Sequence, residues 1–405
     1  MNGTTRPVVL SLALLVLASG CATRRPPSSP TASPPPPTTA SAPARPASPP
    51  PAPPSAIGVL VVPPPRTGAV PVPAPATDPA RARLDEGRAL IARGEMAAAA
   101  VALREALRLR PDLADARASL GLALYAMGDL DGAADELRGL LRVRPDFAEA
   151  RLTLAAALVA RQDWPAARAE LEAALAARPD LVQASYTLGV VRYAQGDLVG
   201  AIDAYRRVLA REPSAHDARY NLALVLKLAR RDAEATPEFL AAAEAGLPRA
   251  QYFAGAAFAT GAGVERDLVA AITWWTRAAE QGVAQADESL VQLRQAVSGR
   301  SRRTPAERQA VEQAFGEYRA RLWKDYPGLA REGDEPLGAA LLRQGRAGEA
   351  IVVLIREAAA LSEPAQRILE TLYDQGIDGQ LLAHDARILA YLKSAAAEGR
   401  SRPRP

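Results

Sequence analysis

Few residues in this chain of 405 residues have the types and spacing that catalysis or metal binding needs. Its two histidines, His216 and His384, are far apart in sequence, and Cys21 is its single cysteine. None of these residues has the spacing of a metal site. The sequence also lacks the Gly-x-Ser-x-Gly, His-Glu-x-x-His and glycine-rich Lys-Ser/Thr patterns. We therefore predict no enzymatic activity, no cofactor and no metal.

Two further patterns allow a chemical and a structural interpretation. Asp131, Asp135 and Glu136 are close enough in sequence for an acid–base pair, but arginines nearby make a solvated helix surface the better interpretation. Gly261-Ala262-Gly263 resembles part of a phosphate loop, but the Lys-Ser/Thr ending is missing and helices are predicted on both sides. For both patterns we favour the structural interpretation over the chemical one. Catalytic carboxylates that are distant in sequence stay an alternative.

The elements that must position a binding surface repeat with a constant period. Prolines recur every 34 residues, at Pro111, Pro145, Pro179 and Pro213. Three other columns keep this period: small residues (Gly87, Gly121, Ala155, Gly189), alanines (Ala99, Ala133, Ala167, Ala201) and large residues (Leu103, Leu137, Leu171, Tyr205). Apolar residues follow helical spacing, and Gly128-Asp129 is typical of a turn between helices. Each period therefore predicts a helix pair, with the proline ending the second helix.

These columns resemble the tetratricopeptide repeat, a family of 34-residue helix-turn-helix units. The clearest copy is Val182–Ala215, and His216–Leu247 is a degenerate fifth copy. The family's usual aromatic at the fourth position is absent, because Arg83, Arg117, Arg151 and Ser185 stand there. The resemblance implies an all-α fold, an α-solenoid of helix-turn-helix repeats, with tetratricopeptide repeats over residues 80–247.

The period changes after the fifth copy. Ala242–Gly282 resembles the Sel-like repeat (SLR), a relative with a longer glycine-containing turn. Trp274 and Trp275 could form a ligand platform, but members of that family carry aromatics there as packing groups. The basic tail Arg400–Pro405 is predicted to fray. The predicted order is an SLR block at 243–296, a loop at 297–304 and, at 305–405, a C-terminal helical block that includes a degenerate SLR copy.

The first residues have the pattern of an export signal. A short basic start at Arg6 precedes the apolar run Val8–Ala18, which is too short to span a bilayer but suits residues 1–20 as a signal peptide. Leu17-Ala18-Ser19-Gly20-Cys21 resembles the lipobox of bacterial lipoproteins, which implies a lipid on Cys21 and anchoring in the membrane. By that family's sorting rule, Ala22 implies the outer membrane, facing the periplasm. An ordinary cleaved signal is the alternative.

A proline-rich stretch separates this signal from the repeats. It holds 21 of the chain's 35 prolines between Pro26 and Pro79. Such a composition cannot bury a core, so residues 21–79 are predicted to be a disordered linker that follows the lipidated cysteine. Ile57–Val62 is either a strand that pairs with a partner's sheet or an incidental apolar stretch, and we favour the latter.

The charge of the chain is concentrated before the repeats. The formal net charge is +4, and the residues before Ala80 include five arginines and one aspartate. The remainder is therefore formally neutral. Because nucleic-acid binding needs a basic face, we predict no nucleic-acid partner.

The tetratricopeptide resemblance also implies a concave groove lined by the first helix of each repeat. Its predicted partner-binding residues are Tyr125, Tyr186, Val190, Tyr193, Tyr220 and Leu224. Tyrosine offers a large apolar face and a hydroxyl, which suits binding of a protein segment. Packing between repeats is the alternative role of each residue.

Together these features predict a non-enzymatic, outer-membrane-anchored periplasmic scaffold. It would bind a protein or peptide partner in envelope assembly or export, such as polysaccharide, pilus or outer-membrane protein machinery. The alternative is a cell-envelope (peptidoglycan) enzyme or enzyme activator.

Overall fold

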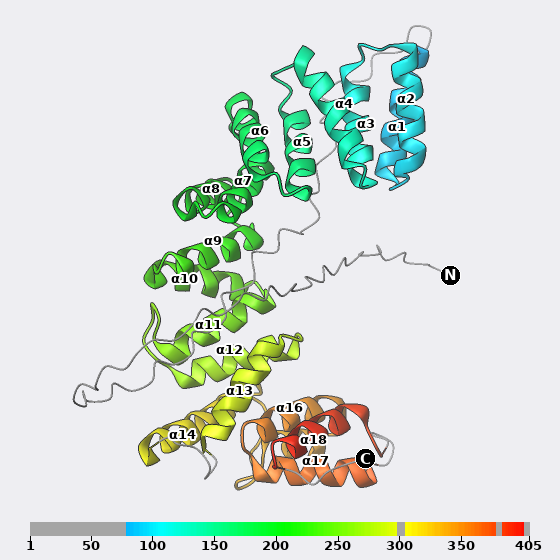
Figure 1. Ribbon diagram of the computed structural model, residues 1–405. Coiled ribbons are helices and arrows are strands. Elements are labelled where there is room, and N and C mark those ends of the chain that lie inside the picture. The colour runs from blue at the N-terminus through cyan, green and yellow to red at the C-terminus, as the bar shows by residue number, and fades with distance from the viewer. Residues whose placement is uncertain (1–77, 298–303, 378–382, 401–405) are drawn as a thin grey trace, which may run out of the picture. The chain divides into compact units, whose positions relative to one another are not determined.

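A computed structural model describes residues 78–297, 304–377 and 383–400, which form eighteen α-helices and one short 3-10 helix (Figure 1). Cys21, Ile57–Val62 and the proline-rich residues up to 77 lie outside the described residues, whereas Asp78 and Pro79, the last two of the predicted linker, cap and begin the first helix. The predicted all-α fold is confirmed for the described part of the chain.

The helices follow one another with short connections. The first ten are α1 Pro79–Ala92, α2 Met96–Leu109, α3 Ala114–Ala126, α4 Leu130–Val143, α5 Ala148–Ala160, α6 Trp164–Ala177, α7 Val182–Ala194, α8 Leu198–Arg211, α9 His216–Leu228 and α10 Asp232–Glu244. The others are α11 Pro248–Thr260, α12 Leu268–Glu280, α13 Ala284–Val297, α14 Pro305–Leu322, η1 Trp323–Asp325, α15 Leu337–Arg343, α16 Ala347–Ala359, α17 Glu363–Gln375 and α18 Ala386–Ala397.

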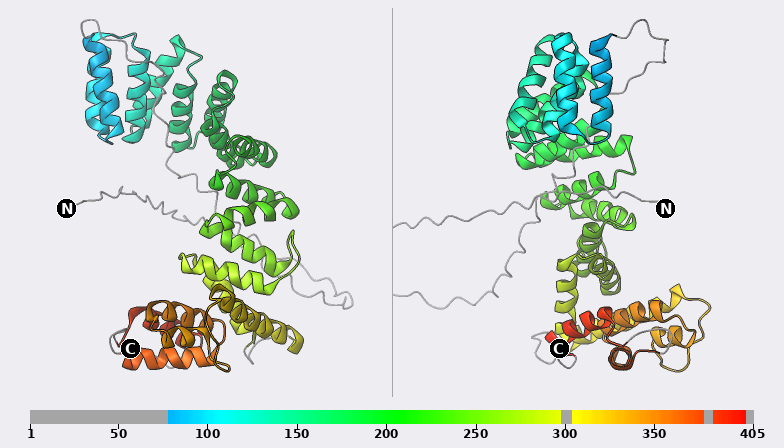
Figure 2. Two further views of the ribbon diagram at one scale, coloured as in Figure 1. Left: turned by 180° about the vertical axis from the view of Figure 1, so that it is seen from behind. Right: turned by 90° about the vertical axis from the view of Figure 1, so that its right-hand side faces the viewer.

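From α1 to α13, each helix packs against the next helix along the chain. Figures 1 and 2 show these helices as successive antiparallel pairs. The first helices of neighbouring pairs also touch, as α3 does with α5. This arrangement is that of an α-solenoid, as predicted from the 34-residue period.

The small and large columns meet inside each helix pair. A Cβ atom added to Gly121 would lie 2.6 Å from Leu137 Cγ, and one added to Gly189 would lie 2.7 Å from Tyr205 Cε1. The large side chain therefore fills the space that the missing side chain leaves. Ala201, from the alanine column, is completely buried. The columns recur because these contacts hold each pair together.

The same contact continues past the 34-residue period. A Cβ atom on Gly255 of α11 would lie 2.5 Å from Trp275 Cδ1 of α12. These residues are 20 positions apart instead of 16, because the turn Gly261–Asp267 is longer. In the α15–α16 pair, Leu354 fills the space beside Gly338, again 16 positions away. Pairs with different sequence signatures thus share one packing arrangement.

Each turn within a repeat needs one residue with a left-handed backbone. Gly128 has a φ of +82°, and the following Asp129 accepts a hydrogen bond from the Gly132 amide at 3.0 Å, which caps α4. Glycine adopts this conformation without strain. Gln162 and Arg230 also have a φ of 60° at the equivalent turns, where the column departs from glycine.

An arginine occupies the position where the tetratricopeptide family usually has an aromatic. The Arg151 guanidinium lies 2.6 Å from the Glu170 carboxylate of the next helix and also donates to the Pro145 carbonyl at 2.9 Å. Arg219 and Glu238 repeat this pair at 2.6 Å. An ion pair between the two helices therefore takes the place of aromatic packing.

The C-terminal helices join α12–α14 through one apolar core. Trp275, Leu290, Phe315, Leu337 and Val353, from five different helices, are buried in it. This core connects the α11–α12 pair to the helices that follow residues 298–303.

A buried ion cluster closes this part of the chain. The Arg294 guanidinium of α13 donates to both oxygens of Glu398, at 2.8 and 2.7 Å. Arg400 binds the same carboxylate at 3.0 Å and donates to the Tyr391 hydroxyl, also at 3.0 Å. The prediction that the frayed tail begins at Arg400 was wrong, because this side chain is tied to a buried carboxylate. Residues 401–405 lie outside the described part.

Candidate partner-binding surface

The six predicted groove residues lie on three first helices of the repeats. They are Tyr125 of α3, Tyr186, Val190 and Tyr193 of α7, and Tyr220 and Leu224 of α9. The four tyrosines are half-buried, whereas Val190 and Leu224 are only 6% and 2% exposed. The two aliphatic residues therefore belong mainly to the interior, and the tyrosines provide the accessible part of the surface.

The structure brings five of these six residues together. Tyr186, Tyr193 and Tyr220 pack against one apolar cluster that includes Val190 and Leu224. Tyr125 packs against a separate cluster, built from α1–α4. The candidate surface therefore centres on α7 and α9, with Tyr125 apart from it.

Contacts with neighbouring helices fix the ring of Tyr186. Its centroid lies 5.8 Å from that of Tyr205 in an edge-to-face arrangement, and its hydroxyl accepts a hydrogen bond from Asn221 Nδ2 at 2.9 Å. Burial raises the pKa of Tyr186, the Asp217 carboxylate raises it further, and the bond from Asn221 opposes both. The phenol is therefore neutral at physiological pH and held in one orientation.

Tyr220 belongs to an aromatic group shared by three helices. Its ring centroid lies 6.1 Å from Phe239 of α10 and 6.2 Å from Phe253 of α11. Those two phenylalanines stack at 4.8 Å. Burial raises the pKa of Tyr220, whereas the nearby Arg249 guanidinium lowers it. The aromatic contacts thus extend the surface from α9 to α11.

Tyr252 was missed by the sequence analysis, although it continues the same set. Tyr186, Tyr220 and Tyr252 are each the fifth residue of their helix, in α7, α9 and α11. The last step is 32 residues instead of 34, so the repeat period hides it. Counting from Pro248, which begins α11, would have revealed it. We call Tyr186, Tyr220 and Tyr252 the tyrosine row.

Asn221 was also missed, and it belongs to a column of buried polar residues. Ser119, Thr153, Thr187 and Asn221 are all buried and spaced by 34 residues. The two threonines donate to carbonyls of their own helices. Asn221 instead reaches Tyr186 on the previous first helix. The constant spacing was the signal that could have found it.

The two tryptophans have different roles. Trp275 is 7% exposed, fills the space beside Gly255, and donates its indole hydrogen to the Tyr252 carbonyl at 3.1 Å. The packing interpretation therefore holds for Trp275. Trp274 is half-buried, and the Arg277 guanidinium lies 5.0 Å from its ring centroid.

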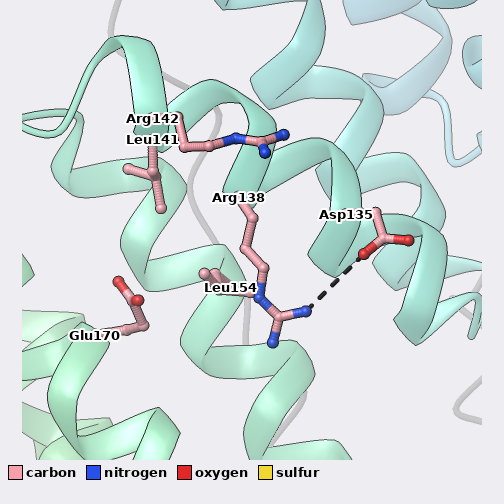
Figure 3. Close-up of a pocket in the computed structure, with 6 residues that line it drawn as sticks. All are labelled: Asp135, Arg138, Leu141, Arg142, Leu154 and Glu170. Carbon is pink, nitrogen blue, oxygen red and sulfur yellow. Dashed lines mark ion pairs between the residues drawn. The ribbon is translucent and has the colours of Figure 1, made fainter.

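A cavity of about 510 Å³ lies between α4, α5 and α6 (Figure 3). Its lining residues are Asp135, Arg138, Leu141, Arg142, Leu154 and Glu170. Asp135 is 82% exposed and 3.9 Å from Arg138, and Glu170 is paired with Arg151. The acidic residues here are thus matched by arginines, as the helix-surface interpretation predicts.

The buried carboxylate of Glu357 has a structural role. It accepts hydrogen bonds from the Leu337 and Gly338 amides, at 2.7 and 3.0 Å, and so caps the start of α15. Burial raises its pKa, although these amides and Arg319 oppose the shift. Across residues 78–297, 304–377 and 383–400, no group of three or more His, Cys, Asp or Glu residues is placed to hold a metal.

None of the helices in the described ranges combines the length and the hydropathy needed to cross a bilayer. This finding concerns residues 78 onward, with the gaps given above.

Comparisons with known proteins identify the repeats. A family model described as TPR repeat matches residues 87–128, and a tetratricopeptide repeat model matches 119–182, 152–211 and 186–251. No curated protein matches the chain. Tyr125, Tyr186, Tyr193 and Tyr220 lie within the matched repeats, and Tyr252 follows directly after them.

Several solved structures are similar over part of the chain. PilF of Pseudomonas aeruginosa is 19% identical, covers 53% of this chain and 98% of its own, and has a TM-score of 0.46. MamA from Desulfovibrio magneticus RS-1 is 23% identical over 42% of this chain and 95% of its own, with a TM-score of 0.39. YrrB, a TPR protein with an unusual peptide-binding site, is 20% identical over 40% of this chain and 84% of its own, with a TM-score of 0.36. From the family models and the packed helix pairs, residues 87–251 consist of tetratricopeptide repeats.

Proposed function

We propose that this chain is a non-enzymatic scaffold that binds a protein partner on the surface around Tyr186, Tyr193 and Tyr220. We further propose that a lipid on Cys21 anchors it in the outer membrane, facing the periplasm, where the partner belongs to an envelope assembly or export machine. Polysaccharide, pilus and outer-membrane protein machinery are the candidates. A peptidoglycan enzyme or enzyme activator is the alternative.

The single observation that supports binding is the group of half-buried tyrosines on tetratricopeptide first helices. Stacked repeats present continuous surfaces to partners. Tyr186 and Tyr220 are already held by neighbouring side chains, so little side-chain entropy is lost when a partner covers them. Their exposed faces offer apolar contact, and aromatic residues of this kind dominate binding energies.

Support for a lipid anchor comes from the sequence alone. Leu17-Ala18-Ser19-Gly20-Cys21 follows an apolar run of signal-peptide length, and Cys21 is the chain's single cysteine. The proline-rich residues 26–77 would then join the anchor to the helices. This arrangement would place the binding surface at a distance from the bilayer.

We also propose the following subdivision of the helical part. Residues 80–247 are tetratricopeptide repeats, 243–296 are an SLR block, and 305–405 are a C-terminal helical block with a degenerate SLR copy. The SLR proposal is supported by the long turn between α11 and α12, in which Gly261 and Gly263 have φ values of +75° and +71°. It is also supported by Trp275, which takes the packing place of Tyr205 in the preceding repeats.

Binding is tested with Tyr186→Ala combined with Tyr193→Ala. Crosslinking and mass spectrometry first identify the partner, and calorimetry then measures its affinity. Losing one buried aromatic anchor costs at least about 2 kcal/mol, or roughly thirtyfold in affinity, so capture by the double variant should nearly disappear.

The matched control removes apolar surface elsewhere. Val101 and Val143 lie on second helices and are 67% and 78% exposed, so replacing both with alanine should leave affinity unchanged. Because Tyr186 supports Asn221, a thermal melt must accompany the double variant. If that variant unfolds, Tyr193→Ala alone serves instead. Unchanged affinity in a folded tyrosine variant contradicts the proposed site.

Anchoring is tested separately with Cys21→Ser. This variant should lose incorporation of labelled fatty acid and should leave the membrane fraction, because the thiol that would carry the lipid is gone. A variant that stays in the membrane without label would show that another anchor exists.

A further inference from the structure

We propose that Arg117 and Arg142 form a binding site for a carboxylate that an acidic segment of another protein supplies. The site lies over Gly139, on α3 and α4 of the second repeat. It goes beyond the proposed function, because it is on another repeat and uses no residue of the tyrosine row. The argument combines a glutamate–arginine pair that α2 has and α4 lacks with an unusual position of Arg117.

The helix α2 shows how this chain binds a carboxylate with an arginine. Arg108 Nε and Nη2 donate to different oxygens of Glu105, both at 2.8 Å. Arginine–carboxylate contacts with two parallel hydrogen bonds are the strong and geometrically specific form. The two residues are three positions apart, and Arg108 is in the last turn of the helix.

The helix α4 repeats this arginine but not the carboxylate. Arg142 comes 34 residues after Arg108, and Gly139 comes 34 residues after Glu105, so each holds the equivalent place in its helix. Arg142 is exposed and makes no ion pair with any residue that the structure describes. In Figure 3 its side chain is accordingly not joined to the other residues drawn.

Arg117 of α3 brings a second guanidinium to the same place. The equivalent arginines of two later repeats, Arg151 and Arg219, each meet a glutamate at 2.6 Å. Arg117 Nε is instead 3.9 Å from the Glu136 carboxylate, which is too far for a hydrogen bond. Its Nη1 lies 3.1 Å from the position that a Cβ atom on Gly139 would occupy.

The two guanidinium groups converge over Gly139, which is buried. Arg142 Nη2 is 3.8 Å from the same Cβ position, and apart from the adjacent residues of the helix nothing else lies within 4 Å of it. Since both nitrogens lie close to one point, one carboxylate can accept a hydrogen bond from each, at about 2.8 Å. A glycine leaves this space to a ligand, whereas a side chain would fill it.

The local charge favours an anion, and the equivalent pair in α2 identifies its class. Glu136 neutralises at most one of the two guanidinium groups, so the place over Gly139 stays positive. At the corresponding place in α2 the arginine binds a carboxylate of the chain itself. An acidic side chain of a partner would supply to Arg142 what Glu105 supplies to Arg108.

The neighbouring cavity limits the kind of segment that fits. Arg142 also lines the cavity of about 510 Å³ shown in Figure 3, together with Leu141. An apolar side chain next to the acidic one can therefore pack against Leu141. Asp135 and Glu170 line the same cavity, so a run of consecutive acids would be repelled. The favoured segment alternates acidic and apolar residues.

The site is specific to one repeat. Ala176 and Ala210 stand in the third and fourth repeats where Arg142 stands in the second. In the first repeat Glu105 already occupies Arg108. An acidic segment would thus be held at one defined place along the solenoid.

The experiment titrates the full chain, in detergent, with the peptide acetyl-Leu-Glu-Leu-amide. Its counterpart contains glutamine in place of glutamate. NMR signals of the arginine Nε–H groups report which guanidinium groups meet the peptide. The signals of Arg117 and Arg142 should shift with the glutamate peptide, and the glutamine peptide should bind at least about fivefold more weakly, because it has no charge.

Single substitutions locate the site. Arg142→Gln and Arg117→Gln should each weaken binding of the glutamate peptide at least about fivefold. The matched control is Arg104→Gln, which removes another exposed arginine without an ion pair among the described residues and should change nothing. Tyr186→Ala with Tyr193→Ala should also leave this affinity unchanged, so failure of the proposed partner surface and failure of this site are distinguishable.

Gly139→Glu introduces the arrangement of α2 into α4. Its carboxylate should bind Arg142 as Glu105 binds Arg108, so the glutamate peptide should bind at least about tenfold more weakly. Gly139→Gln has the same shape without the charge and should weaken binding less. Thermal melts check that both variants fold, and Arg142→Gln, at an exposed side chain, tests the site if they do not.

Three results would overturn the proposal: equal affinities of the two peptides, shifts confined to other arginines, or unchanged binding in Arg142→Gln. Inorganic phosphate is titrated separately. Tighter binding of phosphate than of the glutamate peptide would also overturn it, because the ligand class would then be a phosphate and not a protein carboxylate.

Discussion

In the α7–α8 pair the ring of Tyr205 fills the space beside Gly189, and in the α11–α12 pair the indole of Trp275 fills the space beside Gly255. No hydrogen-bond partner of ordinary geometry meets the buried Tyr205 hydroxyl among the described residues, although Asn221 lies near it, whereas the Trp275 indole donates to the Tyr252 carbonyl. The two pairs therefore share a steric arrangement but differ in polar satisfaction. The comparison shows that shape, and not hydrogen bonding, maintains the repeat contact.

Ion pairs also differ in exposure between the tetratricopeptide repeats and the C-terminal part that follows α12. Among the tetratricopeptide repeats, pairs such as Arg206 with Glu234 have side chains 47% and 44% exposed. In the C-terminal part, the Arg294 and Glu398 side chains are 4% and 7% exposed. Exposed pairs contribute little, whereas breaking a buried pair leaves an uncompensated charge.

The largest effect is therefore expected from Glu398→Gln. It removes the charge that both Arg294 and Arg400 bind, and leaving a buried charge unpaired costs about 3 to 5 kcal/mol. Hydrogen exchange should show opening of α18 against α13. The matched change Glu234→Gln, at a carboxylate with exposed arginine partners, should have a much smaller effect, because solvent screens exposed pairs. Equal losses would remove the distinction between the two parts.

Lowering the pH should open α18 against α13 as Glu398→Gln does, because protonation removes the same negative charge. Burial acts to raise the pKa of Glu398, but hydrogen bonds from Arg294 and Arg400 outweigh it and hold the pKa below its ordinary value. The contribution of Glu398 is thus complete above about pH 4.3, the ordinary glutamate pKa, and is lost as the pH falls through the lower folded value. The pKa of Glu357 is raised, so protonation of this carboxylate at low pH stabilises the folded chain, opposite to the effect at Glu398. Loss of the α13–α18 contact only above neutral pH would contradict this.

An intermediate effect is expected from Trp275→Phe. The smaller ring leaves a void beside Gly255 and loses the indole hydrogen bond to the Tyr252 carbonyl, which together cost about 2 kcal/mol. Tyr205→Phe keeps the ring and removes only an unpartnered hydroxyl, so stability should stay the same or rise. Thermal melts of both variants test the comparison directly. A loss in Tyr205→Phe as large as in Trp275→Phe would mean that the hydroxyl does have a partner.

The smallest effect is expected from Gln162→Gly. A left-handed backbone costs a non-glycine residue roughly 1 to 2 kcal/mol, and part of the gain is offset by the greater freedom of glycine in the unfolded chain. The variant should therefore unfold at a slightly higher denaturant concentration. Gly128→Gln, the reverse change at the equivalent turn, should have the opposite sign.

The sequence predicted the regular helix pairs because each column has one local cause. Gly121 and Leu137 are in direct contact, so their common period reports a distance within the fold. The Arg–Glu pairs had the same kind of signal: Arg151 and Arg219 each meet a glutamate 19 positions later. In the fourth repeat Ser185 and Ala204 hold these places, so both charges are missing together.

The candidate site was predictable only in part. Tyr186 and Tyr220 keep the 34-residue period, but Tyr252 departs from it because one connection is shorter. Val190 and Leu224 follow the groove positions and are nevertheless buried, since the neighbouring helix covers them. The Arg294–Glu398 contact joins residues that are 104 positions apart. Because this contact occurs only once, no repeating pattern in the sequence indicates it.

That last contact also implies an order of folding. The contacts inside the repeats join residues 16 to 20 positions apart, so the loops they close are short and their entropic cost is small. Arg294 and Glu398 are 104 positions apart, so their contact closes a much longer loop at a greater entropic cost. We therefore expect the helix pairs to form first and the ion cluster at the end of α18 to form last. During synthesis, the C-terminal part would then reach its final packing only after residue 400 has been added.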